Sequence, residues 1–459
     1  MIYIILFILL IYTYKSFLNN SVNLIYWLAF VVSIVGVNIH YGITFYLSRI
    51  VILLFLLTFL LKSSFNKKID KIWIYIPFIS IFFQFISVIF SPRKIDGFQN
   101  VFIYISCFFI FILVIAYANK IEHIVKAIKI YLFVGIIQGL YGIYQLFGSI
   151  RGWPTYQTIL AGIPMANDRT EDGYFYSGPF AAFRAIGFFS SDVSHYSGYL
   201  AGVLILSIAL ISYDKTKFYP YLVFFIGLIG LIFSLSRSGI LAFIVFGIPT
   251  LYYTLRRFGL INRFNIFKYK FSFFLIFILI LFINNSPFKE EIPNPFITLS
   301  DRFEDIVNPN EDNGGSMNEH IYTRELGIDA FLSSPIIGVG LGVNASPWYS
   351  EKYQAGWGGS HSYHIDKLGQ TGLVGIIIEW ILMFMILKYM IKALKVKNDN
   401  RISKFLLSGL FATYLTIILG NFLYYYYLND FVWFIMGCCV ALSRIIIKAN
   451  AERLNILSV

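Results

Sequence analysis

Charged residues are scarce in this chain of 459 residues, where Asp, Glu, Lys and Arg together make up only 13%. Hydrophobic residues reach 58%, and the aromatic residues alone account for 19%. A soluble globular protein carries about 25% charged residues, so this composition excludes that class. The chain therefore has the composition of a polytopic membrane protein.

Cysteine is also rare, and Cys107, Cys438 and Cys439 all lie inside apolar stretches. No pair is placed to bridge an extracytoplasmic loop, so the cysteines give no information about the compartment. The sequence also lacks a Walker-type loop, a CxxC pair, an HExxH helix and an internal repeat. We therefore expect neither a metal nor an organic cofactor.

Long apolar stretches are what the sequence has instead. They cover residues 2–17, 21–39, 43–61, 72–91, 99–117, 127–148, 194–212, 220–235, 238–254, 271–286, 371–391, 405–427 and 431–447. Each is close to the length that crosses a bilayer, so we expect an all-α, polytopic protein with about 12 to 14 transmembrane helices. The first stretch lacks a basic start and a small-residue cleavage site, which indicates a retained helix. We expect a single integral membrane domain over residues 1–459.

The net charge of +12 is unevenly placed along the sequence. Basic residues collect at 62–71, 256–270 and 388–404, and such loops face the cytoplasm. Alternation of the helices then leaves residues 149–193 and 287–365 as extracytoplasmic loops, the second of them acidic. Since the positive charge faces inner-leaflet headgroups, a stripe for nucleic acid is excluded.

The larger outer loop contains an ordered piece. Residues 320–334 place Ile321, Leu326, Ile328, Ala330 and Phe331 largely on one side and stop before a proline. This pattern predicts an amphipathic helix at the membrane surface. A glycine-spaced turn follows at residues 336–342, which allows a close approach of the backbone to a neighbour.

Arg184, Arg237 and Arg324 all fall at or beyond the expected outer face. Positive charge there needs an anionic partner, although an arginine at a helix end can also snorkel to headgroups. A lipid-linked diphosphate is such a partner, because guanidinium groups match phosphate bidentately and keep their charge. His361, just before an apolar helix, is the candidate catalytic base, because histidine suits proton transfer at neutral pH.

Other side chains near these positions are candidates for sugar contacts. His195 lies at an expected helix start, where it is either a ligand or a capping and packing residue. The remaining candidates are Trp348, Tyr353, Trp357, Tyr363 and His364. Aromatic residues near a membrane also serve as interfacial anchors, so that alternative stays open for them.

Four segments in order carry a family resemblance: residues 184–190, residues 233–239, the Arg324 helix with residues 335–342, and residues 361–375. Together they resemble the successive motifs of the O-antigen polymerase (Wzy) and O-antigen ligase superfamily, over about residues 180 to 380. The sequence departs from that pattern at Ser362, where the family usually has Asn, and at Gln370, where an acidic residue is common.

The resemblance implies a GT-C-like membrane glycosyltransferase that takes a glycan from undecaprenyl diphosphate. The reaction would occur on the periplasmic or outer face of a bacterial cytoplasmic (inner) membrane. Arg184 and Arg237 would hold the diphosphate, and His361 would activate the acceptor hydroxyl. A polysaccharide chain-length regulator and a flippase are further partners that such a function implies.

We expect a polymerase that transfers the glycan to another undecaprenyl-diphosphate-linked repeat unit. A ligase that transfers it to a lipid A core sugar uses the same donor and stays open. A transporter or flippase of lipid-linked oligosaccharide is the alternative from another class. Transporters place charges at mid-membrane in broken helices with related halves, whereas the polar residues here are expected on one face.

Overall fold

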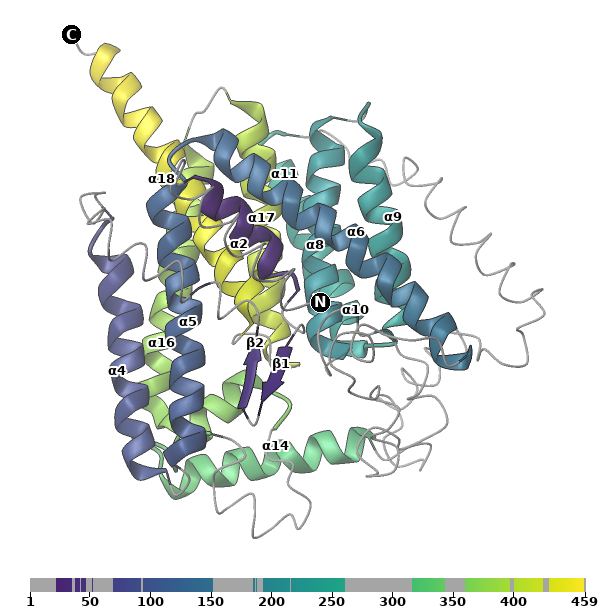
Figure 1. The fold of residues 1–459 in the computed structure, drawn as a ribbon. Helices are drawn as coiled ribbons and strands as arrows, with labels where there is room; N and C mark the ends of the chain where they lie inside the picture. Colours follow the sequence, from purple (N-terminus) through teal and green to yellow (C-terminus); the bar gives the residue numbers. More distant parts are fainter. Residues whose placement is uncertain are drawn as a thin grey trace.

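The computed structural model describes residues 22–34, 38–41, 43–46, 52, 69–91, 94–151, 185, 187, 193–214, 216–260, 316–342, 360–396, 400–423 and 429–457. Within these ranges the chain is a bundle of helices packed side by side, with one further helix lying across an end (Figure 1). Long helices form because a helix pairs its own backbone N–H and C=O groups, and the core of a bilayer offers these groups no other hydrogen-bond partner.

The helices are α2 (Asn23–Val31), α4 (Ile72–Phe90), α5 (Lys94–Tyr117), α6 (Ile121–Arg151), α8 (Val193–Tyr213), α9 (Phe218–Phe233), α10 (Arg237–Leu241), the π-helix η4 (Ala242–Gly247), α11 (Ile248–Arg257), α14 (Ser316–Ser333), α16 (Tyr363–Lys395), α17 (Arg401–Gly420) and α18 (Asp430–Leu457). Eight helices in the described ranges are long and apolar enough to cross a membrane, with α10, η4 and α11 forming one of them. This confirms the polytopic helical class. The expected stretches 2–17 and 271–286, and most of 43–61, lie outside the described residues.

The expected helix over residues 21–39 differs from what the structure has. Helix α2 ends at Val31, and two short antiparallel strands follow, β1 (Asn38–Tyr41) and β2 (Ile43–Tyr46). Polar and apolar residues alternate in β1, and a glycine stands between the strands. A strand-like period and a turn residue thus interrupt a run that hydropathy alone reads as one helix.

Small residues let the helices of the bundle approach closely, as is common between membrane helices. α8 packs against α9 and α17, and α5 packs against α18. At the α8 and α17 contact, a Cβ added to Gly409 would come within 2.7 Å of the Ala209 Cβ. Gly437 of α18 meets Val114 of α5 in the same way, at 2.8 Å.

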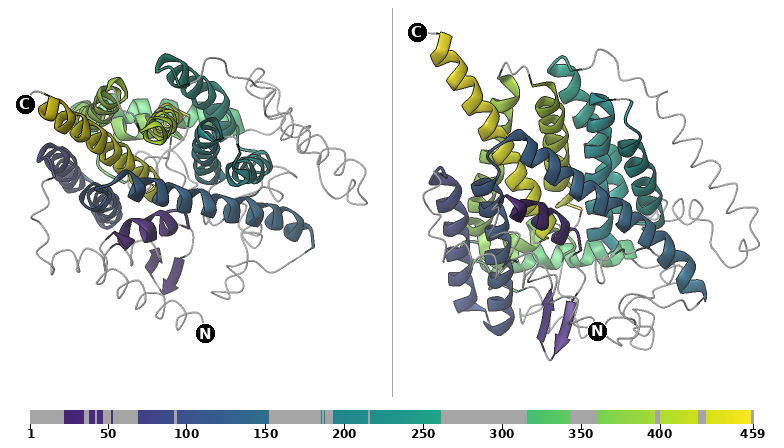
Figure 2. Two further views of the ribbon diagram at one scale, coloured as in Figure 1. Left: turned by 90° about the horizontal axis from the view of Figure 1, so that it is seen from above. Right: turned by 45° about the horizontal axis from the view of Figure 1, so that its top comes forward.

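The two ends of the bundle carry different residues. Helix α14 lies across one end and runs from below α8 and α10 toward α4 and α5 (Figure 1 and Figure 2). We call this the α14 end. The opposite end carries the basic last turn of α11, the basic last turn of α16 and the start of α17. Basic residues therefore gather away from α14 in these helices.

Candidate functional site

Helix α14 delivers side chains to one corner of the α14 end. Its Leu326 and Ala330 are buried, and it packs against α16, where a Cβ added to Gly369 would lie 3.4 Å from the Ala330 Cβ. Ile321 and Ile328, however, are 39% and 47% exposed. A helix covers the predicted residues up to Ser333, but the predicted one-sided apolar face is wrong, because Leu326 and Ala330 are buried while Ile321 and Ile328 are exposed.

His361 lies in a short turn that leads into α16. Its φ is 53°, a left-handed conformation that is uncommon for a residue other than glycine. The Ser360 N–H donates to Asp366 Oδ1 at 2.7 Å, and the Ser360 hydroxyl donates to the Ser362 carbonyl at 3.0 Å. The Tyr363 N–H donates to the carbonyl of Asn421, at the end of α17, at 3.0 Å. The backbone around His361 is thus held from both sides.

His320 packs against His361, with ring centroids 4.2 Å apart and ring planes at 88°. Sequence reasoning missed His320. The available signal was its position one helical turn before Arg324, which places both side chains on the same face of α14. The second ionisable ring therefore comes from a different helix than His361.

Arg324 reaches the same corner from α14. Its guanidinium donates to the carbonyl of Phe422 at 3.4 Å, and the Phe422 ring lies 4.2 Å from the ring of His364. Burial lowers the pKa of the Arg324 guanidinium from its ordinary value. The ordinary value for arginine is so high that the side chain stays charged. A permanent cation and two imidazoles therefore share this corner.

Arg237 begins α10, directly after a turn that joins it to α9. Leu235 in this turn has φ 51°, and the Ser197 hydroxyl donates to the Ser236 hydroxyl at 2.9 Å. A Cβ added to Gly239 would come 2.3 Å from Ser197, so glycine is required where α10 crosses α8. The predicted tight turn between two helices is confirmed.

The other predicted residues near this turn are only partly described. The N–H of Ala185 donates to the Phe233 carbonyl at 3.1 Å, so the chain that follows Arg184 lies beside the end of α9. Arg184 itself lies outside the described residues, as do Trp348, Tyr353 and Trp357. His195 lies half-buried in the first turn of α8, where a helix start was predicted.

His364 is buried and engaged through both ring nitrogens. Trp380 Nε1 donates to His364 Nδ1 at 3.2 Å, which leaves Nε2 as the donor toward the Ile418 carbonyl at 3.4 Å. The Tyr363 hydroxyl is also buried and bonded within the protein. Sugar contacts by Tyr363 and His364 stay predictions. The burial and internal hydrogen bonds of both side chains do not favour such contacts. His361 remains the candidate base.

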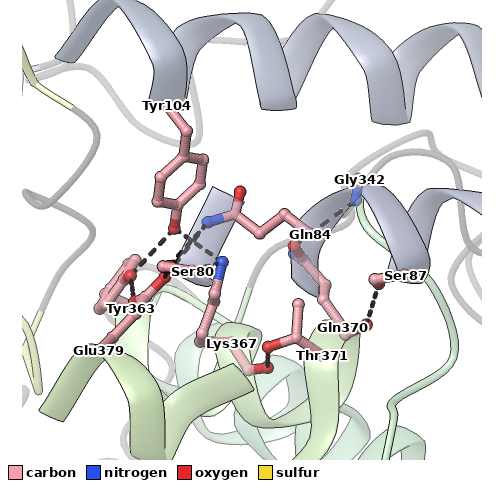
Figure 3. Close-up of polar contacts among 10 residues, drawn as sticks. All are labelled: Ser80, Gln84, Ser87, Tyr104, Gly342, Tyr363, Lys367, Gln370, Thr371 and Glu379. Atoms are coloured by element: carbon pink, nitrogen blue, oxygen red, sulfur yellow. Dashed lines mark hydrogen bonds and ion pairs between the residues drawn. The ribbon is translucent and has the colours of Figure 1, made fainter. Parts of the chain in front are cut away.

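A buried polar network lies just beyond this corner, inside the membrane helices (Figure 3). Lys367 Nζ lies 3.0 Å from Glu379 Oε1, and the two side chains are only 2% and 1% exposed. Lys367 also donates to the Tyr104 hydroxyl at 2.8 Å. The polar residues were expected to be concentrated on one face, and this ion pair is an exception, since it lies within the span of α16.

The network lies next to a break in α16. Gly372 has φ 62° and ψ −166°, which separates the segment 363–371 from the rest of the helix. The freed carbonyl of Gly369 accepts from the Val339 N–H at 2.9 Å, and that of Gln370 accepts from the Ser87 hydroxyl at 2.8 Å. A Cβ on Gly372 would come 2.3 Å from the Ile336 carbonyl, so the predicted glycine-spaced turn does make a close backbone approach.

Residues 222–379 match the family model Wzy_C, described as O-antigen ligase. The match supports a relationship of this segment to the O-antigen polymerase and ligase superfamily. Members of that superfamily are membrane glycosyltransferase-like enzymes that act on lipid-linked oligosaccharides. Comparison with curated proteins found no match to the chain.

The matched segment begins in α9 and ends at Glu379, so it includes His320, Arg324 and His361 of this corner. It also includes Arg237, which begins α10. Within the described ranges, no three His, Cys, Asp or Glu side chains are grouped so that they could hold a metal ion. The guanidinium of Arg324 and the imidazole rings of His320 and His361 are the groups that the described corner offers to an anionic ligand.

Proposed function

We propose that this protein is a polysaccharide polymerase. It transfers a glycan from undecaprenyl diphosphate to the non-reducing end sugar of another undecaprenyl-diphosphate-linked repeat unit, without a metal. The observation that carries the proposal is the meeting of His361, His320 and Arg324 at one end of a membrane bundle, inside the segment that matches the family.

The proposed chemistry follows from these groups. The acceptor hydroxyl oxygen bonds to the anomeric carbon of the donor sugar, while the bond from that carbon to the diphosphate breaks. His361 takes the hydroxyl proton, and undecaprenyl diphosphate leaves with the bonding electrons. Arginine guanidinium groups stabilise the charge that develops on the leaving oxygens, an effect worth about 3 to 4 kcal/mol for a well-placed donor. Arg237 and Arg324, with Arg184, are the residues proposed for this role.

The site is proposed to face the periplasm or the outside of the cytoplasmic membrane. The basic turns of α11, α16 and α17 at the opposite end support this orientation, since such turns face the cytoplasm. Residues 149–193 and 287–365 would then be extracytoplasmic loops of one membrane domain. A chain-length regulator and a flippase are partners proposed from the function alone.

A ligase is the second candidate, because the matched family model carries the description O-antigen ligase. The preference for a polymerase rests on the outer segment 287–365, whose Tyr, Trp and Asn residues suit a second saccharide. A transporter of lipid-linked oligosaccharide is less well supported. The Lys367–Glu379 pair in the broken helix is bonded within the protein and buried, so it lines no path in the described structure.

The test uses purified full-length protein in lipid, with one undecaprenyl-linked repeat unit as both donor and acceptor. The expected products are lipid-linked dimers and longer chains, formed equally well with a chelator. Transfer that requires an added lipid A core acceptor would mean a ligase. Movement of intact lipid-linked sugar across the bilayer, without a new glycosidic bond, would eliminate both enzyme functions.

A further inference from the structure

Four buried side chains close a hydrogen-bonded ring between α5 and α16 (Figure 3). The Tyr363 hydroxyl donates to Glu379 Oε2, so it must accept from the Tyr104 hydroxyl, 2.9 Å away. Tyr104 in turn accepts from Lys367, whose ammonium pairs with Glu379 Oε1. The donors run from the Lys367 ammonium to the Glu379 carboxylate by two paths, one direct and one through the Tyr104 and Tyr363 hydroxyls. Along the second path each hydroxyl accepts one bond and donates the next, so each bond polarises and strengthens the one that follows.

Helix α4 joins the ring through two more contacts. The Ser80 hydroxyl lies 3.5 Å and the Gln84 amide nitrogen 3.4 Å from Glu379 Oε1, and both side chains are donors there. Glu379 lies beyond the break at Gly372, whereas Tyr363 and Lys367 lie before it. The ring therefore ties the short segment 363–371 to the long half of α16 and to two neighbouring helices.

The short segment needs such a tie. It is separated from the rest of α16 by the non-helical Gly372, so the helix itself does not fix its direction. Its first residues carry the turn that holds His361, through the Ser360 to Asp366 bond and the Tyr363 to Asn421 bond. A rotation of the segment would therefore move His361.

We propose that the ring of Lys367, Glu379, Tyr104 and Tyr363 is a latch that positions His361 for glycan transfer. The inference rests on the proposed function, and it makes these four positioning residues that do not touch the substrate. Charged side chains inside a membrane span are costly and are retained where they serve function. In this protein the charged pair would help to fix the segment 363–371 of α16 beneath the site.

A packing role without positioning makes a different prediction. Removing one member of a buried ion pair leaves an uncompensated charge and destabilises strongly, whereas replacing both members with apolar side chains of similar size is often neutral or stabilising. The double variant Lys367→Met with Glu379→Leu therefore separates stability from positioning. Tyr104→Phe is a milder variant, because it opens the ring at one hydroxyl and leaves both charges in place.

The matched control is Tyr199→Phe. Tyr199 is also fully buried, and its hydroxyl donates to the Tyr131 carbonyl at 2.8 Å, away from the ring. The measurements on each variant are thermal stability, affinity for the undecaprenyl-linked donor, kcat and KM of transfer, and hydrogen exchange of residues 360–371.

The double variant should keep its melting temperature and donor affinity, and its kcat should fall by about 10- to 100-fold, the size of effect that a displacement of about 1 Å causes. Tyr104→Phe should lower kcat severalfold at unchanged donor KM, and both variants should exchange faster over residues 360–371. Tyr199→Phe should change neither kcat nor the hydrogen exchange of residues 360–371. Full kcat in the double variant, or equal kcat in Tyr104→Phe and Tyr199→Phe, would overturn the latch.

The exchange readout keeps the two proposals apart. If the wild-type protein makes no glycosidic bond, the proposed function fails, while faster exchange over residues 360–371 in the ring variants still supports a latch on this segment. If transfer occurs but the ring variants exchange and react like the wild type, the latch alone fails. If the double variant does not fold, Tyr104→Phe and its control decide.

Discussion

The hydrogen bond from the Ser360 N–H to Asp366 Oδ1 gives the sharpest test of how His361 is held. Ser360 and Asp366 are 0% and 3% exposed, and the bond is 2.7 Å long. Asp366→Ala would leave a buried N–H without this acceptor, which costs about 1 to 3 kcal/mol. The left-handed conformation of His361 itself costs about 1 to 3 kcal/mol, so the turn has a reason to relax once the bond is gone.

If that free energy is lost from the transition state, kcat falls by about 5- to 150-fold in Asp366→Ala. Donor binding should change little, because the arginines and the apolar surroundings supply it. Asp366→Asn is the matched control, since its amide oxygen can accept the same N–H. The assay is initial-rate transfer by purified protein, with donor affinity measured separately.

Two outcomes would refute the reasoning. Wild-type kcat in Asp366→Ala would show that the turn does not depend on this bond. Equal losses in Asp366→Asn and Asp366→Ala would show that the carboxyl acts through its charge or acidity, and that the hydrogen bond to Ser360 is incidental.

Three further predictions concern the charged groups and the topology. Arg237→Ala should lower the rate of transfer by about 100- to 1,000-fold, and Arg237→Lys should have an intermediate rate. The control Arg257→Ala, at the opposite end of the bundle, should stay active. A normal glycan ladder in cells that carry Arg237→Ala at the wild-type protein level would contradict the diphosphate role. His320→Phe keeps an aromatic edge against His361 but no ionisable group, so a change in the pH dependence of kcat is expected, and an unchanged pH profile would remove His320 from the proton chemistry. Single cysteines at Leu332 and Lys448, 67% and 75% exposed, should label from opposite sides of the membrane with an impermeant thiol reagent, and labelling from one side would overturn the orientation.

Local patterns carried much of the fold and part of the site. The spans from residue 72 onward in the described ranges follow from apolar runs of bilayer length, and the tight turn before Arg237 follows from its Ser and Gly residues. Strands β1 and β2 were not predicted, because a short apolar run with β-branched residues is compatible with both a helix and a strand.

The ring between α5 and α16 was not predicted, for a different reason. Tyr104 and Tyr363 meet although they are 259 residues apart, and no local pattern encodes such a contact. Tyr363 was expected to contact sugar because it stands next to the candidate base, yet its hydroxyl points toward Glu379. The spacing of His320 from Arg324 indicates only that both lie on one face of α14, and the pairing of His320 with His361 becomes visible in three dimensions.

The seam between residues 334–342 and the break in α16 has a consequence for motion. Backbone hydrogen bonds from Val339 and Leu373 cross it in opposite directions, to the carbonyls of Gly369 and Pro335. These bonds join the chain that follows α14 to the break in α16, so we expect α14 and the first part of α16 to move together as long as the seam and the ring are intact. The separation of Arg324 and His361 would then stay constant. Arg237 belongs to α10, which packs on α8. Under the proposed function, a change in the distance between Arg237 and His361 would therefore require α10 to move relative to α14 and the first part of α16.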